Sequence, residues 1–225
     1  MGNHTLIIDS IIKRFRNNFI LSDVYINCKT NDIIGLFGRN GIGKSTLLKI
    51  IYGIEDAENK FIKIDQKVLK KGYLNNNYIS FLPQDSFLPK YLTVIKIINL
   101  YIDFDFKHEF LNDQIINLII DKKVKNLSGG ELRYFEIKLI LLSKTKFSFL
   151  DEPFMGLSPI YIEKVKKLIQ IASANKGIII TDHDYLNVLN IANKLYLIKD
   201  GKTILLKNKE DLINFGYLSE NRLYS

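Results

Sequence analysis

The chain has 225 residues, which is enough for one well-packed core with a small inserted subdomain. Hydrophobic residues make up 47% and charged residues 25%, and this balance excludes a disordered chain. The net charge of +8 comes mostly from scattered lysines, without the block of five or six that would favour a nucleic-acid surface, so we expect a solvated basic face.

Alternating or apolar runs predict short strands in both halves of the chain, and longer runs with helical apolar spacing predict helices. The expected strands are residues 6–9, 22–28, 33–37, 61–65, 78–82, 147–150, 177–181, 195–198 and 203–206. The expected helices are residues 45–52, 94–101, 110–120, 131–143 and 159–173. Strands that alternate with helices indicate a parallel sheet with helices on both faces.

Several single residues carry local signals. Gly53 is expected to end the first helix, and Ser158 to cap the last one with Pro159 in its first position. The asparagine run at residues 75–77 predicts a loop. The single cysteine, Cys28, lies in an apolar-alternating stretch and is expected in the core.

The chain shows neither an apolar run near the ~18 residues of a membrane span nor a secretory signal, so we expect a soluble, cytoplasmic protein.

A glycine-rich segment, residues 38–45, lies between an expected strand and an expected helix. It consists of Gly38, Arg39, Asn40, Gly41, Ile42, Gly43, Lys44 and Ser45, and Thr46 follows it. In this pattern backbone N–H groups converge on phosphate oxygens, and glycines allow that close approach. The lysine reaches the β- and γ-phosphates, and the serine hydroxyl ligates Mg²⁺. We call this segment the phosphate loop, and it predicts binding of a nucleoside triphosphate.

An acidic pair, Asp151 and Glu152, follows the apolar strand at residues 147–150. Beside a phosphate loop, the first carboxylate is placed to hold Mg²⁺ through its water shell. The second is then placed to act as general base toward the attacking water. The alternative is an ordinary acidic pair in a turn, and the upstream phosphate loop favours the catalytic interpretation.

Residues 127–131, here called the signature segment, read Leu-Ser-Gly-Gly-Glu and precede an expected helix. Ser128, Gly129, Gly130 and Glu131 form a second anion-binding turn on one interpretation and a plain serine helix cap on the other. The order of phosphate loop, signature segment and acidic pair resembles the nucleotide-binding subunits of ABC transporters over nearly the whole chain.

The resemblance implies an α/β fold of the P-loop NTPase type, with a parallel sheet covered by helices on both faces and a small antiparallel β region. One domain would cover residues 1–225, with an ATPase core at about 1–86 and 145–225 around a helical subdomain at about 87–144. It also implies Mg²⁺-dependent ATP hydrolysis by a dimer, because the signature segment of one protomer faces the γ-phosphate held by the other. The implied partners are a second ABC ATPase subunit and a transmembrane permease at the inner face of the cell membrane.

Three further residues match family positions. Gln84 follows a strand like the family glutamine that contacts Mg²⁺, although alone it is a polar turn residue. His183 matches the histidine that touches the γ-phosphate, whereas a lone histidine after a strand is usually structural. Phe15 stands where the family stacks an aromatic ring on adenine, and both it and Phe19 would also suit the core. The implied catalytic residues are thus Glu152, His183 and Gln84, and the implied metal ligands are Ser45, Gln84 and Asp151.

The sequence departs from the family pattern at two positions. Ser158 stands where related branches carry an aspartate that makes contacts across the dimer interface, and Leu132 where many relatives have glutamine or arginine, although Arg133 remains. Two other functions are alternatives to the transporter motor. A soluble ABC-type ATPase acting on the ribosome or nucleic acid usually carries two nucleotide domains in one chain. A non-catalytic scaffold predicts loss of Glu152 or His183, and both are present.

Overall fold

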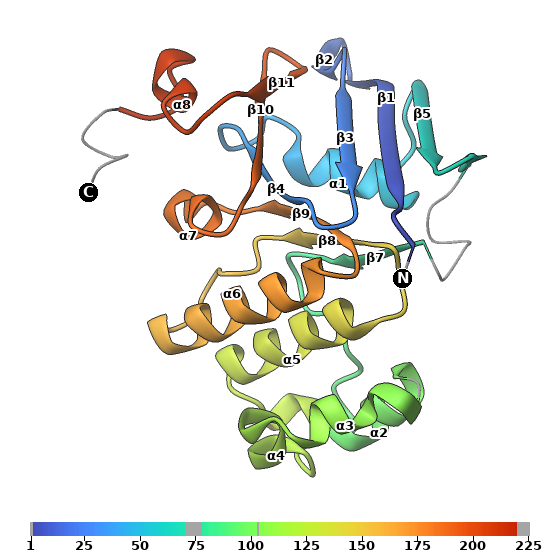
Figure 1. Ribbon diagram of the computed structural model, residues 1–225, viewed down its shortest axis with the longest axis vertical. Helices are drawn as coiled ribbons and strands as arrows, with labels where there is room; N and C mark the ends of the chain where they lie inside the picture. Colours follow the sequence, from blue (N-terminus) through green and yellow to red (C-terminus); the bar gives the residue numbers. More distant parts are fainter. Residues whose placement is uncertain (1, 71–77, 103, 220–225) are drawn as a thin grey trace.

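The computed structural model describes residues 2–70, 78–102 and 104–219, so the asparagine run at residues 75–77 lies outside the described residues. Two β-sheets and a layer of helices make up the fold (Figure 1). Within the part of the chain that the structure describes, no helix has the length and hydropathy needed to cross a bilayer.

The central sheet has six strands in the order β11-β10-β4-β9-β8-β7. Five of them are parallel, and the edge strand β11 runs antiparallel to β10. Their bounds are β4 (Ile33–Phe37), β7 (Ile79–Leu82), β8 (Phe147–Asp151), β9 (Gly177–Thr181), β10 (Lys194–Lys199) and β11 (Lys202–Leu206). Because the strands are parallel, the carboxyl ends of β4, β7, β8 and β9 meet at one edge of the sheet.

A second, antiparallel sheet is built around β1, which pairs with β2, β3 and β5. Its strands are β1 (Thr5–Phe15), β2 (Asn18–Leu21), β3 (Tyr25–Lys29), β5 (Asn59–Ile64) and β6 (Lys67–Val68). The expected single strand at residues 22–28 is wrong, because the chain breaks between β2 and β3. There the Ser22 N–H donates to the Gly201 carbonyl at 2.8 Å, which draws these residues toward the turn between β10 and β11.

The helices are α1 (Lys44–Tyr52), α2 (Val94–Tyr101), α3 (Phe104–Leu111), α4 (Gln114–Ile119), α5 (Gly129–Leu142), α6 (Pro159–Ser173), α7 (Tyr185–Leu189), α8 (Asp211–Asn214) and the 3₁₀ turn η2 (Val124–Asn126). The expected helix at residues 110–120 is wrong as one element, because Asp113 ends α3 and caps α4. Its carboxylate accepts from the Ile115 and Ile116 N–H groups and from the Tyr134 hydroxyl. The helices α2 to α5 fill the interval in which a helical subdomain is expected, whose boundaries stay a prediction.

Helices cover both faces of the central sheet, as expected from the sequence (Figure 1). Helix α1 packs between the two sheets, while α5, α6 and α7 cover the opposite face. A cluster of buried hydrophobic residues lies on each face of the central sheet, and β8 contributes side chains to both. Phe147 and Phe149 face the α1 side, and Leu150 faces the α5 and α6 side. The parallel α/β fold with a small antiparallel region is therefore confirmed.

The local signals have different outcomes. Gly53 ends α1 with φ +100°, and its N–H donates to the Lys49 carbonyl at 2.8 Å, as expected. Cys28 is fully buried, so its assignment to the core is confirmed. Ser158 occupies the N-cap of α6, but its hydroxyl makes no capping hydrogen bond, so the expected side-chain cap is wrong. The helix begins instead with Pro159 at its first position and a backbone bond from Ile162 to the Ser158 carbonyl.

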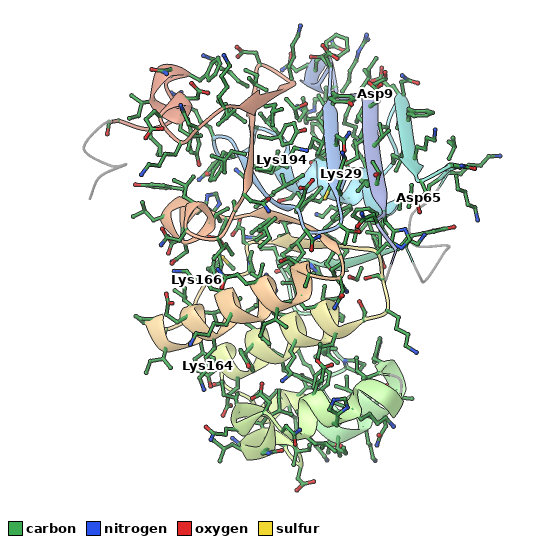
Figure 2. All side chains as sticks on the ribbon, viewed as in Figure 1. Asp9, Lys29, Asp65, Lys164, Lys166 and Lys194 are labelled. Atoms are coloured by element: carbon green, nitrogen blue, oxygen red, sulfur yellow. The ribbon has the colours of Figure 1, made fainter. Side chains whose placement is uncertain are left out.

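The lysines are spread over separate elements of the molecule. Figure 2 shows Lys164 and Lys166 on α6, apart from Lys29 and Lys194 near the two sheets. Several of the positive charges are balanced locally, such as Lys166 by Glu163 at 2.8 Å and Lys194 by Asp32 at 3.5 Å. The predicted solvated basic face stays a prediction.

Lys176 is a buried lysine that has no place in the predicted site. Lys176, immediately before β9, donates from Nζ to the Ser143 carbonyl at 2.7 Å and to the Thr145 hydroxyl at 3.3 Å. Burial lowers the pKa of Lys176 to about 7, because the apolar surroundings disfavour the ammonium form. Between pH 7 and the ordinary lysine pKa of 10.5, the unfolded chain therefore binds a proton that the folded chain releases.

We predict that Lys176 makes the folded state more stable as pH rises from about 7 to about 10, by at most ~1.4 kcal/mol per pH unit. Urea unfolding at several pH values should show this slope in the wild type and a smaller slope in Lys176→Met. Lys167→Met, which changes an exposed lysine on α6, should keep the wild-type slope. Equal slopes for Lys176→Met and the wild type would contradict the assignment.

Candidate functional site

The phosphate loop connects β4 to α1 through three glycines in backbone conformations that other residues rarely adopt. The φ angles are +156° at Gly38, +75° at Gly41 and +106° at Gly43. A Cβ atom on Gly43 would also lie 2.6 Å from Cγ2 of Ile20. The loop therefore requires glycine both for its path and for its contact with β2.

Lys44 folds back across this loop and is 7% exposed. Its Nζ donates to the carbonyls of Gly38 at 2.7 Å and Arg39 at 3.3 Å. Burial lowers the pKa of Lys44, and nearby carboxylates, Glu152 first among them, oppose that shift. The loop thus places a cationic group at its centre, close to the acidic pair.

Asp151 ends β8 with its carboxylate buried between α1 and β9. Its Oδ1 accepts hydrogen bonds from the Ser45 hydroxyl at 3.0 Å and the Thr181 hydroxyl at 2.6 Å. Its Oδ2 is buried and has no hydrogen-bond partner among the described residues. A buried carboxylate oxygen without a donor fits a cation or a cation-bound water, because oxygen is the ligand that Mg²⁺ prefers.

Glu152 has the left-handed backbone angle φ +51° and is 6% exposed. Its N–H donates to the Thr181 carbonyl at 2.7 Å. Its Oε1 lies 2.9 Å from Nε2 of His183, and its Oε2 accepts from Nε2 of Gln84 at 3.2 Å. The strained backbone therefore directs the Glu152 side chain toward two polar side chains that follow neighbouring strands.

A pocket of about 320 Å³ lies among these groups. It is lined by Ile20, Asn40, Gly41, Gly43, Lys44, Ser45, Thr46, Gln84, Glu152 and His183. The structure thus brings together the phosphate loop, the acidic pair, the glutamine and the histidine. The arrangement can hold a polyphosphate against backbone N–H groups and a lysine, with a carboxylate beside its end.

The signature segment lies outside this pocket, at the start of α5. The Ser128 hydroxyl accepts from the Glu131 N–H at 3.2 Å, while the Glu131 carboxylate accepts from the Ser128 N–H at 2.8 Å. This reciprocal pair is a capping box, so the plain helix-cap role is present in the structure. Ser128 and Gly129 are also exposed to solvent.

Phe15 also lies outside the pocket, at the end of β1 and 64% exposed. Phe19 is 52% exposed, and the Arg14 guanidinium lies over its ring at 4.0 Å. The alternative that either ring belongs to the core is therefore wrong. An exposed ring on the hairpin beside Ile20 stays available for stacking on a base.

The structure adds Arg133, to which the sequence assigned no role. This buried side chain of α5 donates to the carbonyls of Pro83 at 2.8 Å, Asp151 at 2.7 Å and Glu152 at 3.0 Å. One planar guanidinium therefore joins α5 to the residues after β7 and to the acidic pair after β8. An arginine among apolar neighbours on a predicted helix was the available sequence signal.

Two further buried carboxylates hold the residues that follow β7 and β8. Glu136, 3.6 Å from Arg133, accepts from the Ser86 hydroxyl at 2.6 Å and the Phe87 N–H at 3.2 Å. Asp182 accepts from the Phe154 N–H at 2.8 Å, which ties the turn after Glu152 to the end of β9. The sequence carried little sign of either role, because these bonds join residues 28 to 50 positions apart.

Comparison with known proteins shows the family of the chain. Residues 21–155, which are more than half of the chain, match the family model described as ABC transporter. The chain belongs to the ABC transporter family. It is an ATP-binding and ATP-hydrolysing subunit that powers a membrane ABC transporter, as the sequence predicts.

Related proteins cover nearly the whole chain. It is 29% identical to the lipopolysaccharide export system ATP-binding protein of Haemophilus influenzae, over 92% of this chain and 91% of that protein. It is 29% identical to the protein of the same name from Escherichia coli strain K12, over 89% of each. A solved structure described as the ATP-binding subunit of an ABC transporter is 21% identical, covers 97% of both chains and superimposes with a TM-score of 0.83, which shows the fold.

We predict that Arg133→Lys lowers the ATPase turnover at least tenfold, which corresponds to a rise of about 1.4 kcal/mol in the activation barrier. Lysine keeps the charge opposite Glu136 but cannot hold three carbonyls with one planar group. Steady-state ATPase assays of the purified chain test this, with Arg14→Lys at an exposed ion pair as the control. Turnover within twofold of wild type would show that Arg133 does not position the acidic pair.

Proposed function

We propose that the chain hydrolyses Mg-ATP at this pocket and works as one half of a dimer on a membrane-embedded permease. The observation that supports the site most strongly is the convergence of Lys44 at the start of α1 with Asp151 and Glu152 at the end of β8. In this proposal the N–H groups of the phosphate loop and Thr46 bind the phosphates, and Lys44 neutralises their charge.

Three side chains would hold Mg²⁺ beside the phosphates. Ser45 and Asp151 are already hydrogen-bonded, and the second Asp151 oxygen is buried without a partner among the described residues. Gln84 reaches the same pocket from the residues after β7. The ion would neutralise charge on the phosphates.

Glu152 is proposed as the general base. Its carboxylate lies in the pocket, and contacts with His183 and Gln84 hold both of its oxygens. In this position it can accept a proton from water that attacks the terminal phosphate. His183 is half exposed, so its ring would also reach the γ-phosphate, while Phe15 would stack on adenine.

The dimer proposal rests on where the signature segment lies. Ser128 and Gly129 are exposed at the start of α5, and this segment is absent from the lining of the pocket beside Lys44. The N–H groups of this helix start suit an anion brought by another molecule. A second copy, or a related subunit, would therefore complete each ATP site.

An apolar groove supports the permease as a partner. A pocket of about 670 Å³ lies between β7, α2 and α5, and its lining includes Ile54, Phe87, Leu100 and Tyr101. Leu100 is 70% exposed and Tyr101 57% exposed, which suits an apolar segment of another chain. Phe87 also connects this groove to the segment that carries Gln84. Binding there would place the subunit at the inner face of the cell membrane.

We predict that Glu152→Gln binds Mg-ATP but hydrolyses it at least a hundredfold more slowly, because glutamine cannot accept the proton. The variant should accumulate as an ATP-bound dimer, while the ADP form stays monomeric. Activity assays and light scattering measure the two effects, and Glu58→Gln at an exposed ion pair is the control. Wild-type turnover would exclude Glu152 as the base, and an inactive monomer at saturating Mg-ATP would contradict the shared site.

We predict that Leu100→Asp disrupts association with the membrane subunit while leaving the ATPase activity of the isolated chain within twofold of wild type. A charge in the apolar groove would have to be desolvated against the partner. Co-purification from native membranes with mass spectrometry measures the association. Leu118→Asp is a matched control, because that leucine of α4 is 78% exposed and lies outside the groove. Undiminished association of Leu100→Asp would contradict this docking site.

A further inference from the structure

A methionine lies beside the acidic pair, in the turn that leads from β8 to α6. The N–H of Met155 donates to the Glu152 carbonyl at 3.3 Å, so the two residues share one tight turn. The Met155 side chain is 52% exposed. Of the other sulfur-containing residues, Cys28 is fully buried and Met1 lies outside the described residues. Among the described residues, Met155 is therefore the sulfur open to a dissolved oxidant.

The sulfur of Met155 contacts the same amide group that holds the proposed base. Nε2 of Gln84 donates to Oε2 of Glu152 at 3.2 Å and to Sδ of Met155 at 3.9 Å. A side-chain amide carries two hydrogens on its nitrogen, so each acceptor can take one. A thioether is a weak acceptor and a carboxylate a strong one, so Glu152 determines where the Gln84 amide points.

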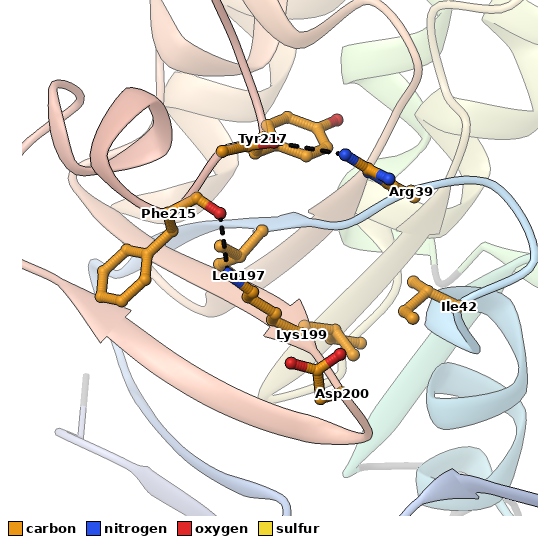
Figure 3. Close-up of a pocket in the computed structure, with 9 residues that line it drawn as sticks. Arg39, Ile42, Leu197, Lys199, Asp200, Phe215 and Tyr217 are labelled. Carbon is orange, nitrogen blue, oxygen red and sulfur yellow. Dashed lines mark hydrogen bonds between the residues drawn. The ribbon is translucent and has the colours of Figure 1, made fainter.

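Polar side chains in a second pocket, which borders the phosphate loop, are held differently. This pocket of about 300 Å³ is shown in Figure 3. There the Arg39 guanidinium donates to the Gly216 carbonyl at 3.5 Å. Nζ of Lys199 donates to the Phe215 carbonyl at 3.1 Å. Peroxide does not change a backbone carbonyl, whereas it changes the thioether beside Gln84 into a polar group.

We propose that Met155 is a site of reversible oxidation to methionine sulfoxide and that this modification slows ATP hydrolysis. With hydrogen peroxide as the oxidant, the sulfur lone pair attacks one peroxide oxygen and an S–O bond forms. The O–O bond breaks with its electron pair on the second oxygen, which takes the proton of the transferred oxygen and leaves as water. The sulfur is oxidised by two electrons and the peroxide is reduced.

The sulfoxide competes with Glu152 for the Gln84 amide. Its oxygen is polar and accepts hydrogen bonds, and it is bonded to the sulfur that already contacts Nε2 of Gln84. When the amide turns toward this oxygen, Oε2 of Glu152 loses the bond that orients it. The inference rests on the proposed roles of Glu152 and Gln84 in hydrolysis. Met155 thus acts on the reaction through Gln84 and only after it is oxidised.

The test moves the exposed methionine to a distant strand. The control chain carries Met155→Leu together with Leu205→Met. Leu205 is 55% exposed, much as Met155 is, and it lies on β11, which β10, β4 and β9 separate from β8. Wild type and control are treated with hydrogen peroxide in the absence of nucleotide and mapped by peptide mass spectrometry. We expect a sulfoxide at position 155 in the wild type and at position 205 in the control, and an unmodified position 155 in the wild type would overturn the proposal.

Steady-state ATPase assays provide the first readout. Turnover should fall roughly tenfold in the oxidised wild type, the equivalent of one hydrogen bond to a charged group, and recover after treatment with methionine sulfoxide reductases. The oxidised control should stay within twofold of its untreated form. An equal loss in both chains would indicate general oxidative damage and overturn the proposal, and so would full turnover in the oxidised wild type.

The side-chain amide of Gln84 provides a readout that does not depend on hydrolysis. In chains labelled with nitrogen-15 glutamine, its NMR signals are assigned by their loss in Gln84→Ala. They should shift when the wild type is oxidised and stay in place when the control is oxidised. Unchanged signals in the oxidised wild type would overturn the route through Gln84. If the untreated wild type failed to hydrolyse ATP, the proposed function of the site would fail, while a shift of these signals would still support the contact.

Discussion

The buried carboxylate of Asp151 is the constraint around which the site is organised. A charged group in a protein interior is costly unless its oxygens are paired. Here one oxygen accepts from the hydroxyls of Ser45 and Thr181, which fixes α1 and β9 relative to β8. The other oxygen has no hydrogen-bond partner among the described residues, which makes it the contact we propose for a cation. The same carboxylate thus serves the local packing and the proposed chemistry.

Arg133 connects that site to the rest of the molecule. It lies on α5, the helix that begins at the signature segment, and it binds the backbone on either side of the Asp151–Glu152 peptide. With Glu136 it also holds residues 83–87, which carry Gln84 and border the apolar groove. A displacement of α5 would therefore act on the acidic pair and on the groove through one buried ion pair. Buried polar networks of this kind have few alternative arrangements, because an unpaired member is costly.

Much of the fold could be predicted from the sequence. Apolar runs with clear end signals, such as β4, β9, α2 and α6, match the expected bounds because the apolar pattern and the end signals are both local. Two of the errors fall where a distant group competes with local preference. The strand expected at residues 22–28 breaks because the Ser22 N–H donates a hydrogen bond to the Gly201 carbonyl. The helix expected at residues 110–120 breaks because the Asp113 carboxylate accepts a hydrogen bond from the Tyr134 hydroxyl of α5.

The sequence by itself determined the family, the phosphate loop and the residue types of the site, because each depends on spacing within a short segment. The glycines of the loop are one example, since their φ angles exclude other residues. Only the tertiary structure decided that Gln84, Glu152 and His183 meet in one pocket while Ser128 and Phe15 lie outside it. It also decided the roles of Arg133 and Asp182. Their partners are distant in sequence, and a hydrogen bond between such residues has no periodicity that a sequence can display.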